Sequence, residues 1–194
     1  MATNVLLCGV GGQGTVLASK LIALAALERG ENVRTAETIG MAQRGGYVVS
    51  HVRTGDKINS PLIPLGGADI LIGFEPAEAV RCLPYLKKDG IVIVNSKAVK
   101  PVTATLSDSN YEGTEMINYL KKNMNQCYVI DGEAISLSVG SPKVLNIVLL
   151  TAAVKYGNLG MSIEELKQTI IHKIPEKYHQ SNLLAVNKIC EKTI

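Results

Sequence analysis

The sequence predicts a three-layer α/β/α sandwich around a mostly parallel β-sheet, and three observations support this fold class. The apolar run Val5–Val10 stops at a glycine cluster and precedes an Ala/Leu-rich segment with helical spacing, which is typical of a strand, a tight turn and a helix. Asp69–Phe74 contains a continuous apolar run, as expected of a strand buried on both faces of a parallel sheet. Strands and helical segments then alternate in βαβ order.

The first half of the chain supplies most of the expected sheet. The residue patterns predict strands over Val5–Val10, Asn32–Glu37, Tyr47–Thr54, Asp69–Phe74 and Ile91–Asn95. The stretches 38–46 and 54–68 contain several glycines or prolines and lack a clear period, so we expect loops there.

Two helices are expected in the same half. The first covers Gly14–Arg29 and ends at Gly30, because a glycine readily adopts the left-handed conformation that closes a helix. Its spacing predicts a common face made of Leu17, Leu21, Leu24 and Leu27. Pro76 suits the first turn of the second helix, which should end near Gly90.

The second half of the chain is expected to be mainly helical. Val102–Leu106 is a candidate edge strand, and Tyr128–Asp131 is expected to be a last central strand. Helices are predicted over Glu112–Asn123, from Ser141 to about Tyr156, and over Ser181–Glu191. Ser162 and Glu165 have the spacing of a capping box, which predicts another helix start between the last two.

Composition limits the function classes. The chain has 194 residues, a length that fits a single domain over 1–194. A net charge of +3 and only 4% aromatic residues give no basis for nucleic-acid binding. No signal peptide or membrane-spanning run is evident, so we expect a cytoplasmic protein with no membrane partner. The four cysteines are far apart in sequence and do not predict a zinc or iron–sulfur site; they are Cys8, Cys82, Cys127 and Cys190.

The glycine cluster is the first candidate site. Gly9, Gly11 and Gly14 fit the G-x-G-x-x-G dinucleotide motif in a Rossmann-like strand–turn–helix context, with Glu37 as a candidate for its ribose-binding acid. A P-loop is disfavoured because Thr15-Val16 replace its Lys and Ser/Thr. Such a turn presents backbone N–H groups to an anion. The alternative is a turn that only packs the helix against the sheet.

The second candidate site is the segment Gln43–Gly46. An arginine beside a Gly-Gly pair can present its planar guanidinium to a phosphate or carboxylate, although Arg44 in a loop ion pair is the alternative. On the following strand, Arg53 is either a ligand or a solvated strand end, and a lone His51 is more often structural. Glu75 follows a central strand, where it either lines a ligand crevice or places its charge at the N-terminus of the next helix.

These stretches together resemble a known family, the gamma-type domain of 2-oxoacid:ferredoxin oxidoreductases. The similarity is to its indolepyruvate-type beta subunits and is strongest over residues 4–95. It rests on Gly9-Val10-Gly11-Gly12-Gln13-Gly14, Gly40-Met41-Ala42-Gln43-Arg44-Gly45-Gly46, Ser50-His51-Val52-Arg53, Ser60-Pro61-Leu62-Ile63-Pro64 and Gly73-Phe74-Glu75-Pro76 with Glu78-Ala79.

The resemblance implies oxidative decarboxylation of a 2-oxoacid, with coenzyme A as acyl acceptor and ferredoxin as electron acceptor. It further implies that thiamine diphosphate and the iron–sulfur clusters are bound by a large alpha subunit, without which this chain is inactive. The sequence predicts no catalytic residue and no metal ligand here. The residues expected to bind cofactor or substrate are Gly9, Gly11, Gly12, Gln13, Gly14, Gln43, Arg44, Gly45, Gly46, Ser50, Arg53 and Glu75.

Two other functions remain open from the residues alone. One is a stand-alone nicotinamide- or flavin-nucleotide oxidoreductase that uses the glycine motif and Glu37. The other is a non-catalytic nucleotide-binding or regulatory module.

Overall fold

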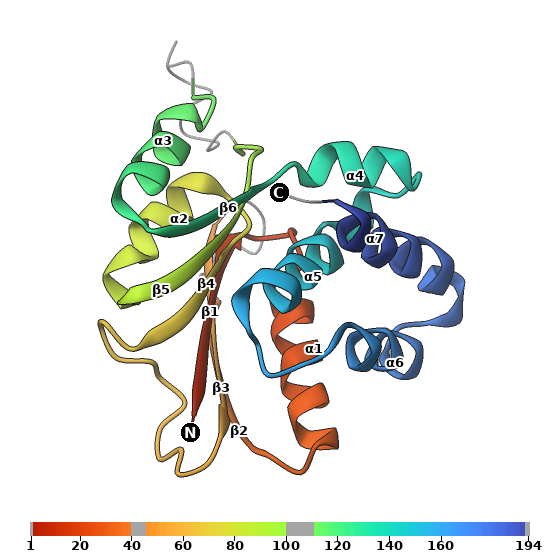
Figure 1. The fold of residues 1–194 in the computed structure, drawn as a ribbon, viewed down its shortest axis with the longest axis horizontal. Helices are drawn as coiled ribbons and strands as arrows, with labels where there is room; N and C mark the ends of the chain where they lie inside the picture. Colours follow the sequence, from red (N-terminus) through yellow and green to blue (C-terminus); the bar gives the residue numbers. More distant parts are fainter. Residues whose placement is uncertain (1, 40–45, 100–110, 193–194) are drawn as a thin grey trace.

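The computed structural model describes residues 2–39, 46–99 and 111–192, and they form a six-stranded sheet with the order β2-β3-β1-β4-β5-β6 (Figure 1). The strands are β1 (Thr3–Val10), β2 (Asn32–Ile39), β3 (Tyr47–Gly55), β4 (Ala68–Gly73), β5 (Leu86–Asn95) and β6 (Gln126–Ile130). β1, β4, β5 and β6 pair in parallel, whereas β3 runs antiparallel to both its neighbours, β1 and β2. The expected mostly parallel sheet is confirmed.

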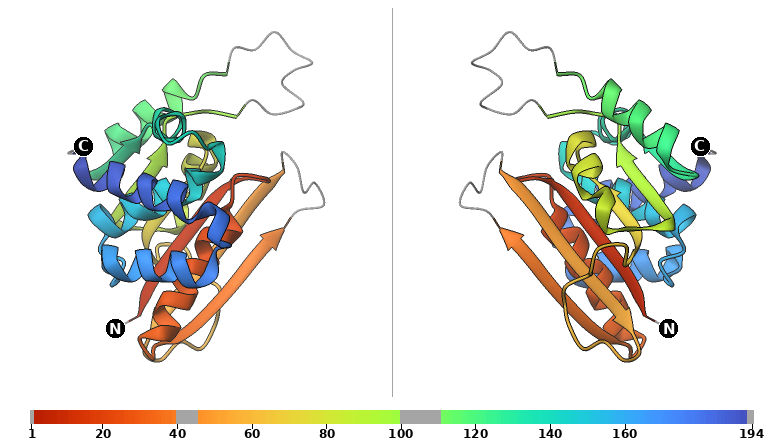
Figure 2. Two further views of the ribbon diagram at one scale, coloured as in Figure 1. Left: turned by 90° about the vertical axis from the view of Figure 1, so that its right-hand side faces the viewer. Right: turned by 90° about the vertical axis from the view of Figure 1, so that its left-hand side faces the viewer.

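β3 lies between β1 and β2, so β2 is an edge strand of the sheet (β2 and β3 are orange in Figure 2). Its register pairs Val10 with Tyr47 and Asn4 with Arg53. The glycine turn after β1 and the start of β3 therefore lie at the same end of the strands. Arg53 lies near the opposite end, beside the start of β1.

Helices cover both faces of the sheet, which confirms the three-layer sandwich (Figures 1 and 2). α1 and α5 pack on one face with α6 and α7 behind them, and α2 and α3 pack on the other. The helices are α1 (Thr15–Glu28), α2 (Pro76–Cys82), α3 (Thr114–Asn123), α4 (Gly132–Ser138), α5 (Leu145–Gly157), α6 (Ile163–Lys173) and α7 (His179–Glu191). Alternate residues of β1 enter the two cores, Leu7 beneath α1 and Leu6 beneath α2.

The helix that begins at Pro76 is much shorter than predicted. α2 ends at Cys82, a short 3-10 helix covers Leu83–Tyr85, and β5 already begins at Leu86. Pro84 has no backbone N–H and cannot donate the next i→i−4 hydrogen bond to Val80, so the α-helix ends here although Leu83 keeps a helical backbone and apolar spacing alone would continue it.

The buried face of α1 also differs from the prediction. Leu21 is fully buried, but Leu17 and Leu27 are 40% and 55% exposed. The buried face instead consists mostly of small side chains and includes Ala18, Ala25 and Ala26. Because α1 is apolar nearly all round, its leucine spacing could not select the buried face, and the small residues allow close packing on the sheet.

The C-terminal half differs in detail from the prediction. β6 is an edge strand rather than a central one. A short 3-10 helix, Pro142–Val144, precedes α5, and α4 was not expected as a separate helix. The capping box is confirmed, because the Glu165 N–H donates to Ser162 Oγ and the Ser162 N–H donates to the Glu165 carboxylate. Val102–Leu106 lies outside the described residues.

Arg53 connects β3 to the loop after it. Its Nε donates to Asn4 Oδ1 at 2.8 Å, and its Nη1 donates to the carbonyls of Ser60 and Leu62 at 2.9 and 3.3 Å. A planar guanidinium can donate in these different directions at once, which an ammonium on a flexible stem reproduces poorly. Arg53 therefore holds the loop against the amino-terminal end of β1.

Arg53→Lys is expected to lower the free energy of unfolding by about 1–2 kcal/mol, since charge-assisted hydrogen bonds to the loop are lost. Urea unfolding of the purified chain measures this. Arg34→Lys is the matched control, because Arg34 pairs with Arg53 across β2 and β3 but, among the described residues, donates only a 3.5 Å bond to the carbonyl of Val33. Equal loss in both variants would contradict a role for Arg53 in holding the loop.

Candidate functional site

The carboxyl ends of the parallel strands form one edge of the sheet. Most of the described residues that the sequence singled out lie at this edge. The Gly11 N–H donates to the carbonyl of Gly46 at 2.9 Å, so the glycine turn contacts the end of the second candidate segment. The Phe74 N–H donates to the carbonyl of Cys8 at 2.8 Å and brings the end of β4 against the same turn. In open α/β sheets, ligands bind at this edge.

Gln13 fills the inner side of the glycine turn. Its Oε1 accepts from the Val10 N–H at 2.8 Å, and its Nε2 donates to the carbonyl of Phe74 at 3.0 Å. A Cβ on Gly9 would lie 2.7 Å from Gln13 Oε1 and 2.7 Å from Phe74 Cβ. Gly9 is thus required by the close approach of Gln13 and of β4. The Val10 N–H at the start of the turn is therefore bonded to Gln13 and is not available to a ligand.

Gly14 lies on the outer side of the turn, which is the side toward Asn146 of α5. Its φ is +87°, a conformation that other residues adopt at a cost, and a Cβ there would lie 3.1 Å from both Cβ and Nδ2 of Asn146. Gly12 has a φ of +100°, but a Cβ added to it would have no neighbour within 4 Å among the described residues. The turn therefore packs α1 against the start of α5, and Asn146 is buried at that contact.

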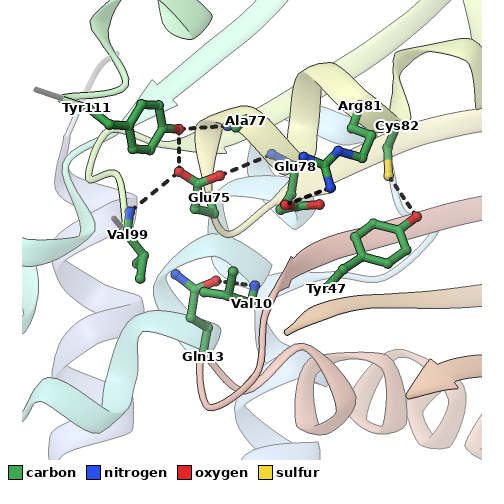
Figure 3. A network of polar contacts seen from close by, with 10 residues as sticks. All are labelled: Val10, Gln13, Tyr47, Glu75, Ala77, Glu78, Arg81, Cys82, Val99 and Tyr111. Atoms are coloured by element: carbon green, nitrogen blue, oxygen red, sulfur yellow. Dashed lines mark hydrogen bonds and ion pairs between the residues drawn. The ribbon is translucent and has the colours of Figure 1, made fainter. Parts of the chain in front are cut away.

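Glu75 is buried at the end of β4 and caps α2 (Figure 3). Its Oε2 accepts from the Glu78 N–H at 3.0 Å, and its Oε1 accepts from the Tyr111 hydroxyl at 2.6 Å and from the Val99 N–H at 3.4 Å. This geometry places the Glu75 carboxyl group at the N-terminus of α2. Burial, followed by the bond to Glu75, raises the pKa of Tyr111 and keeps its hydroxyl a donor.

A second buried carboxyl, Glu78, lies beside this cap. Its side chain is 9% exposed; Oε1 is 3.4 Å from the Arg81 guanidinium, and Oε2 has no hydrogen-bond partner among the described residues. Burial raises the pKa of Glu78, and Arg81 opposes this shift. The buried carboxyl is therefore easier to protonate than an ordinary glutamate.

Two buried thiols and a tyrosine complete this face of the site. The Tyr47 hydroxyl is 3.8 Å from Cys82 Sγ (Figure 3). Burial raises the pKa of the Cys8 thiol well above its ordinary value, whereas a hydrogen bond from Cys8 lowers the pKa of Cys82 against the effect of burial. Both thiols are fully buried, so neither is open to a reagent from solvent.

The structure separates three predicted residues from this edge. Arg53 lies at the other end of β3, and Ser50 is fully buried mid-strand, opposite Leu7. Glu37 is on β2, which β3 separates from β1, and it accepts a hydrogen bond from Ser19 of α1 at 3.1 Å. That arrangement differs from the dinucleotide motif, in which the acid follows the strand next to the turn. Gln43, Arg44 and Gly45 lie outside the described residues.

His51 has a structural role, as expected. It is buried, and its Nδ1 accepts from the Ile63 N–H at 3.2 Å. Burial lowers its pKa, so the imidazole is neutral and anchors the loop after β3. No group of three or more His, Cys, Asp or Glu side chains that could hold a metal ion occurs within residues 2–39, 46–99 and 111–192. In the same ranges, no helix is long and apolar enough to cross a membrane.

Sequence reasoning missed two polar residues at this edge. Asn95, at the end of β5, donates to the Phe74 carbonyl at 3.3 Å and accepts from the Gly132 N–H at 3.3 Å. Tyr111 lies outside every predicted element, and no local pattern connects it to Glu75. The sequence feature that could have identified Asn95 is its position as a polar residue at the end of a buried apolar strand.

Comparison with known proteins identifies the family. The family described as Pyruvate ferredoxin/flavodoxin oxidoreductase matches residues 4–191. The chain belongs to this family. It is 40% identical to the Indolepyruvate oxidoreductase subunit IorB of Archaeoglobus fulgidus over 96% of this chain and 92% of that protein. It is 35% identical to the Pyrococcus horikoshii protein of the same name over 94% and 91% of the two chains.

Solved structures show the same fold. The gamma subunit of the keto/oxoacid ferredoxin oxidoreductase from Geobacter sulfurreducens superposes with a TM-score of 0.68 at 21% identity, over 98% of this chain and 99% of that one. A chain of the 2-oxoglutarate:ferredoxin oxidoreductase from Magnetococcus marinus gives 0.71 at 19% identity, over 99% of this chain but 32% of that one. The chain is a subunit of an oxoacid ferredoxin oxidoreductase, as its named relatives indicate, and in the Magnetococcus marinus protein the same fold forms part of a longer chain.

Gly14→Ala is expected to lower the free energy of unfolding by about 2–3 kcal/mol, because the left-handed backbone is strained and the new Cβ presses on Asn146. Gly12→Ala has the strain without the contact and should cost about 1–2 kcal/mol. Urea unfolding of both variants separates the two effects. If Gly14→Ala is no worse than Gly12→Ala, the packing of the turn on Asn146 has no energetic importance.

Glu78→Gln is expected to stabilise the chain increasingly as pH rises from 4 to 8. A carboxyl whose pKa is raised by folding contributes its stability in the protonated form, and this contribution is lost as pH rises through the folded pKa. Glutamine stays neutral throughout. Melting temperatures at several pH values test this, with Glu115→Gln in the first turn of α3 as an exposed control. A gain in Glu78→Gln that does not depend on pH would count against the raised pKa.

Proposed function

We propose that this chain is the small subunit of an indolepyruvate- or arylpyruvate-type 2-oxoacid:ferredoxin oxidoreductase. The complex would decarboxylate its substrate oxidatively to an acyl-CoA and pass the electrons to ferredoxin. The supporting observation is the 40% identity over 96% of the chain to a protein named as an indolepyruvate oxidoreductase subunit. The proposal includes a single domain over residues 1–194 and a cytoplasmic location.

The proposed reaction requires chemistry that a partner must supply. Decarboxylation of a 2-oxoacid needs an electron sink, which thiamine diphosphate provides and side chains do not. Electron transfer to ferredoxin needs redox centres, which are commonly clusters held by closely spaced cysteines. The four cysteines here are far apart in sequence, which supports placing the cofactor and the clusters on a large alpha subunit.

Within that complex, we assign the glycine turn and the segment Gln43–Gly46 to the side that faces coenzyme A. The contact of Gly46 with the glycine turn and the first-turn N–H groups of α1 support an anionic ligand there. The inner side of the turn is filled by Gln13, so the ligand would approach from outside the turn. A stand-alone dinucleotide enzyme is disfavoured because β3 separates Glu37 from the strand that carries the glycine motif.

The decisive experiment expresses the chain with and without a candidate large alpha subunit from the same genome. Viologen reduction by indolepyruvate and coenzyme A should require both chains, whereas the small chain alone should unfold cooperatively and show no turnover. The complex should be stable, which calls for an interface of at least about 1,000 Å². Turnover by this chain alone with added thiamine diphosphate, or nicotinamide-dependent activity without a partner, would overturn the assignment.

A further inference from the structure

A partly enclosed cleft of about 170 Å³ lies on the outer side of the glycine turn, between three helices. The first turns of α1, α5 and α7 contribute residues to it. The residues that matter here are Leu17, Lys143, Asn146, Ile174, Tyr178 and Asn182. The cleft lies among the helices of the α1 and α5 face of the sheet, whereas the Glu75 cap belongs to α2 on the other face.

Two buried asparagines in the cleft wall are only half satisfied. Asn146 is 5% exposed; its Oδ1 accepts from the Ile147 N–H at 3.0 Å, and its Nδ2 has no partner among the described residues. Asn182 is also 5% exposed; its Nδ2 donates to the carbonyl of Tyr178 at 2.7 Å, and its Oδ1 has none within the same ranges. Both unpartnered atoms stay accessible to solvent, so the cleft offers one donor and one acceptor to a ligand.

The other lining residues define the ligand's character. Lys143 is the charged residue among the described residues that line the cleft, and its Nζ is 5.7 Å from the centre of the Tyr178 ring. Leu17, Ile174 and the Tyr178 ring make the wall largely apolar. Leu17 is 40% exposed although α1 buries its other face, which leaves an apolar side chain available to a ligand. An apolar wall with a single cation suits an amphipathic anion better than a bare phosphate.

We propose that this cleft binds a small organic carboxylate with an apolar body. The carboxylate lies between Lys143 and the free Nδ2 of Asn146, and the apolar body packs on Leu17 and Tyr178. The free Oδ1 of Asn182 accepts an N–H or O–H of ligands that have one. Because Asn146 also contacts Gly14, an occupied cleft bears directly on the glycine turn. This inference stands whether or not the proposed function holds.

The test uses phenylacetate as the probe, titrated into the full chain by calorimetry and by amide NMR. We expect saturable binding, with shifts concentrated at residues 141–146 and 178–182. 2-Phenylethanol keeps the ring but lacks the charge and should bind at least about tenfold more weakly; acetate and inorganic phosphate lack the apolar body and should also bind more weakly. No turnover is measured, so failure here is distinct from failure of the enzyme assignment.

Two pairs of variants test the geometry. Lys143→Ala should weaken phenylacetate binding by about tenfold, whereas Lys177→Ala should not, because Lys177 also lies over the Tyr178 ring, at 5.0 Å, but does not line the cleft. Leu17→Trp should fill the cleft and abolish binding, with Leu27→Trp as a control at an exposed position on the same helix. The proposal is overturned if phenylacetate does not bind, if acetate or phosphate binds as tightly, or if folded Lys143→Ala and Lys177→Ala bind equally.

Discussion

The peptide group of Phe74 is the point on which this edge of the sheet depends. Its N–H donates to the end of β1, and its carbonyl accepts from Gln13 of the glycine turn and Asn95 of β5. Asn95 in turn accepts from Gly132 at the start of α4. A hydrogen-bonded chain therefore runs across the parallel strands where their helices begin. Buried polar groups of this kind fix one arrangement, since any displacement leaves several of them unpaired.

This network explains how a glycine-rich turn can have the spacing of the dinucleotide motif while a side chain of the protein fills its inner side. In a dinucleotide fold, the close approach that the glycines permit is taken up by pyrophosphate. Here the side chain of Gln13 occupies the inside of the turn, and β3 displaces β2 from the side of β1. The same local sequence thus serves a subunit fold in which the inner face of the turn is satisfied by protein.

The two faces of the turn consequently have separate roles. The inner face connects strands and is closed, and the nearby cap at Glu75 holds together the start of α2, Tyr111 and Val99. The outer face rests on Asn146, where residues from the first turns of three helices line a cleft.

The sequence by itself determined the elements whose signals are local. The strand–turn–helix at Val5–Glu28 and the capping box at Ser162 follow from residue spacing and cap chemistry, which depend on near neighbours only. Tertiary structure alone decided which face of α1 is buried, that Arg53 lies far from the turn, and that Asn146 meets Gly14. Those outcomes depend on strand order and on helix packing, and no periodicity within a single segment encodes either one.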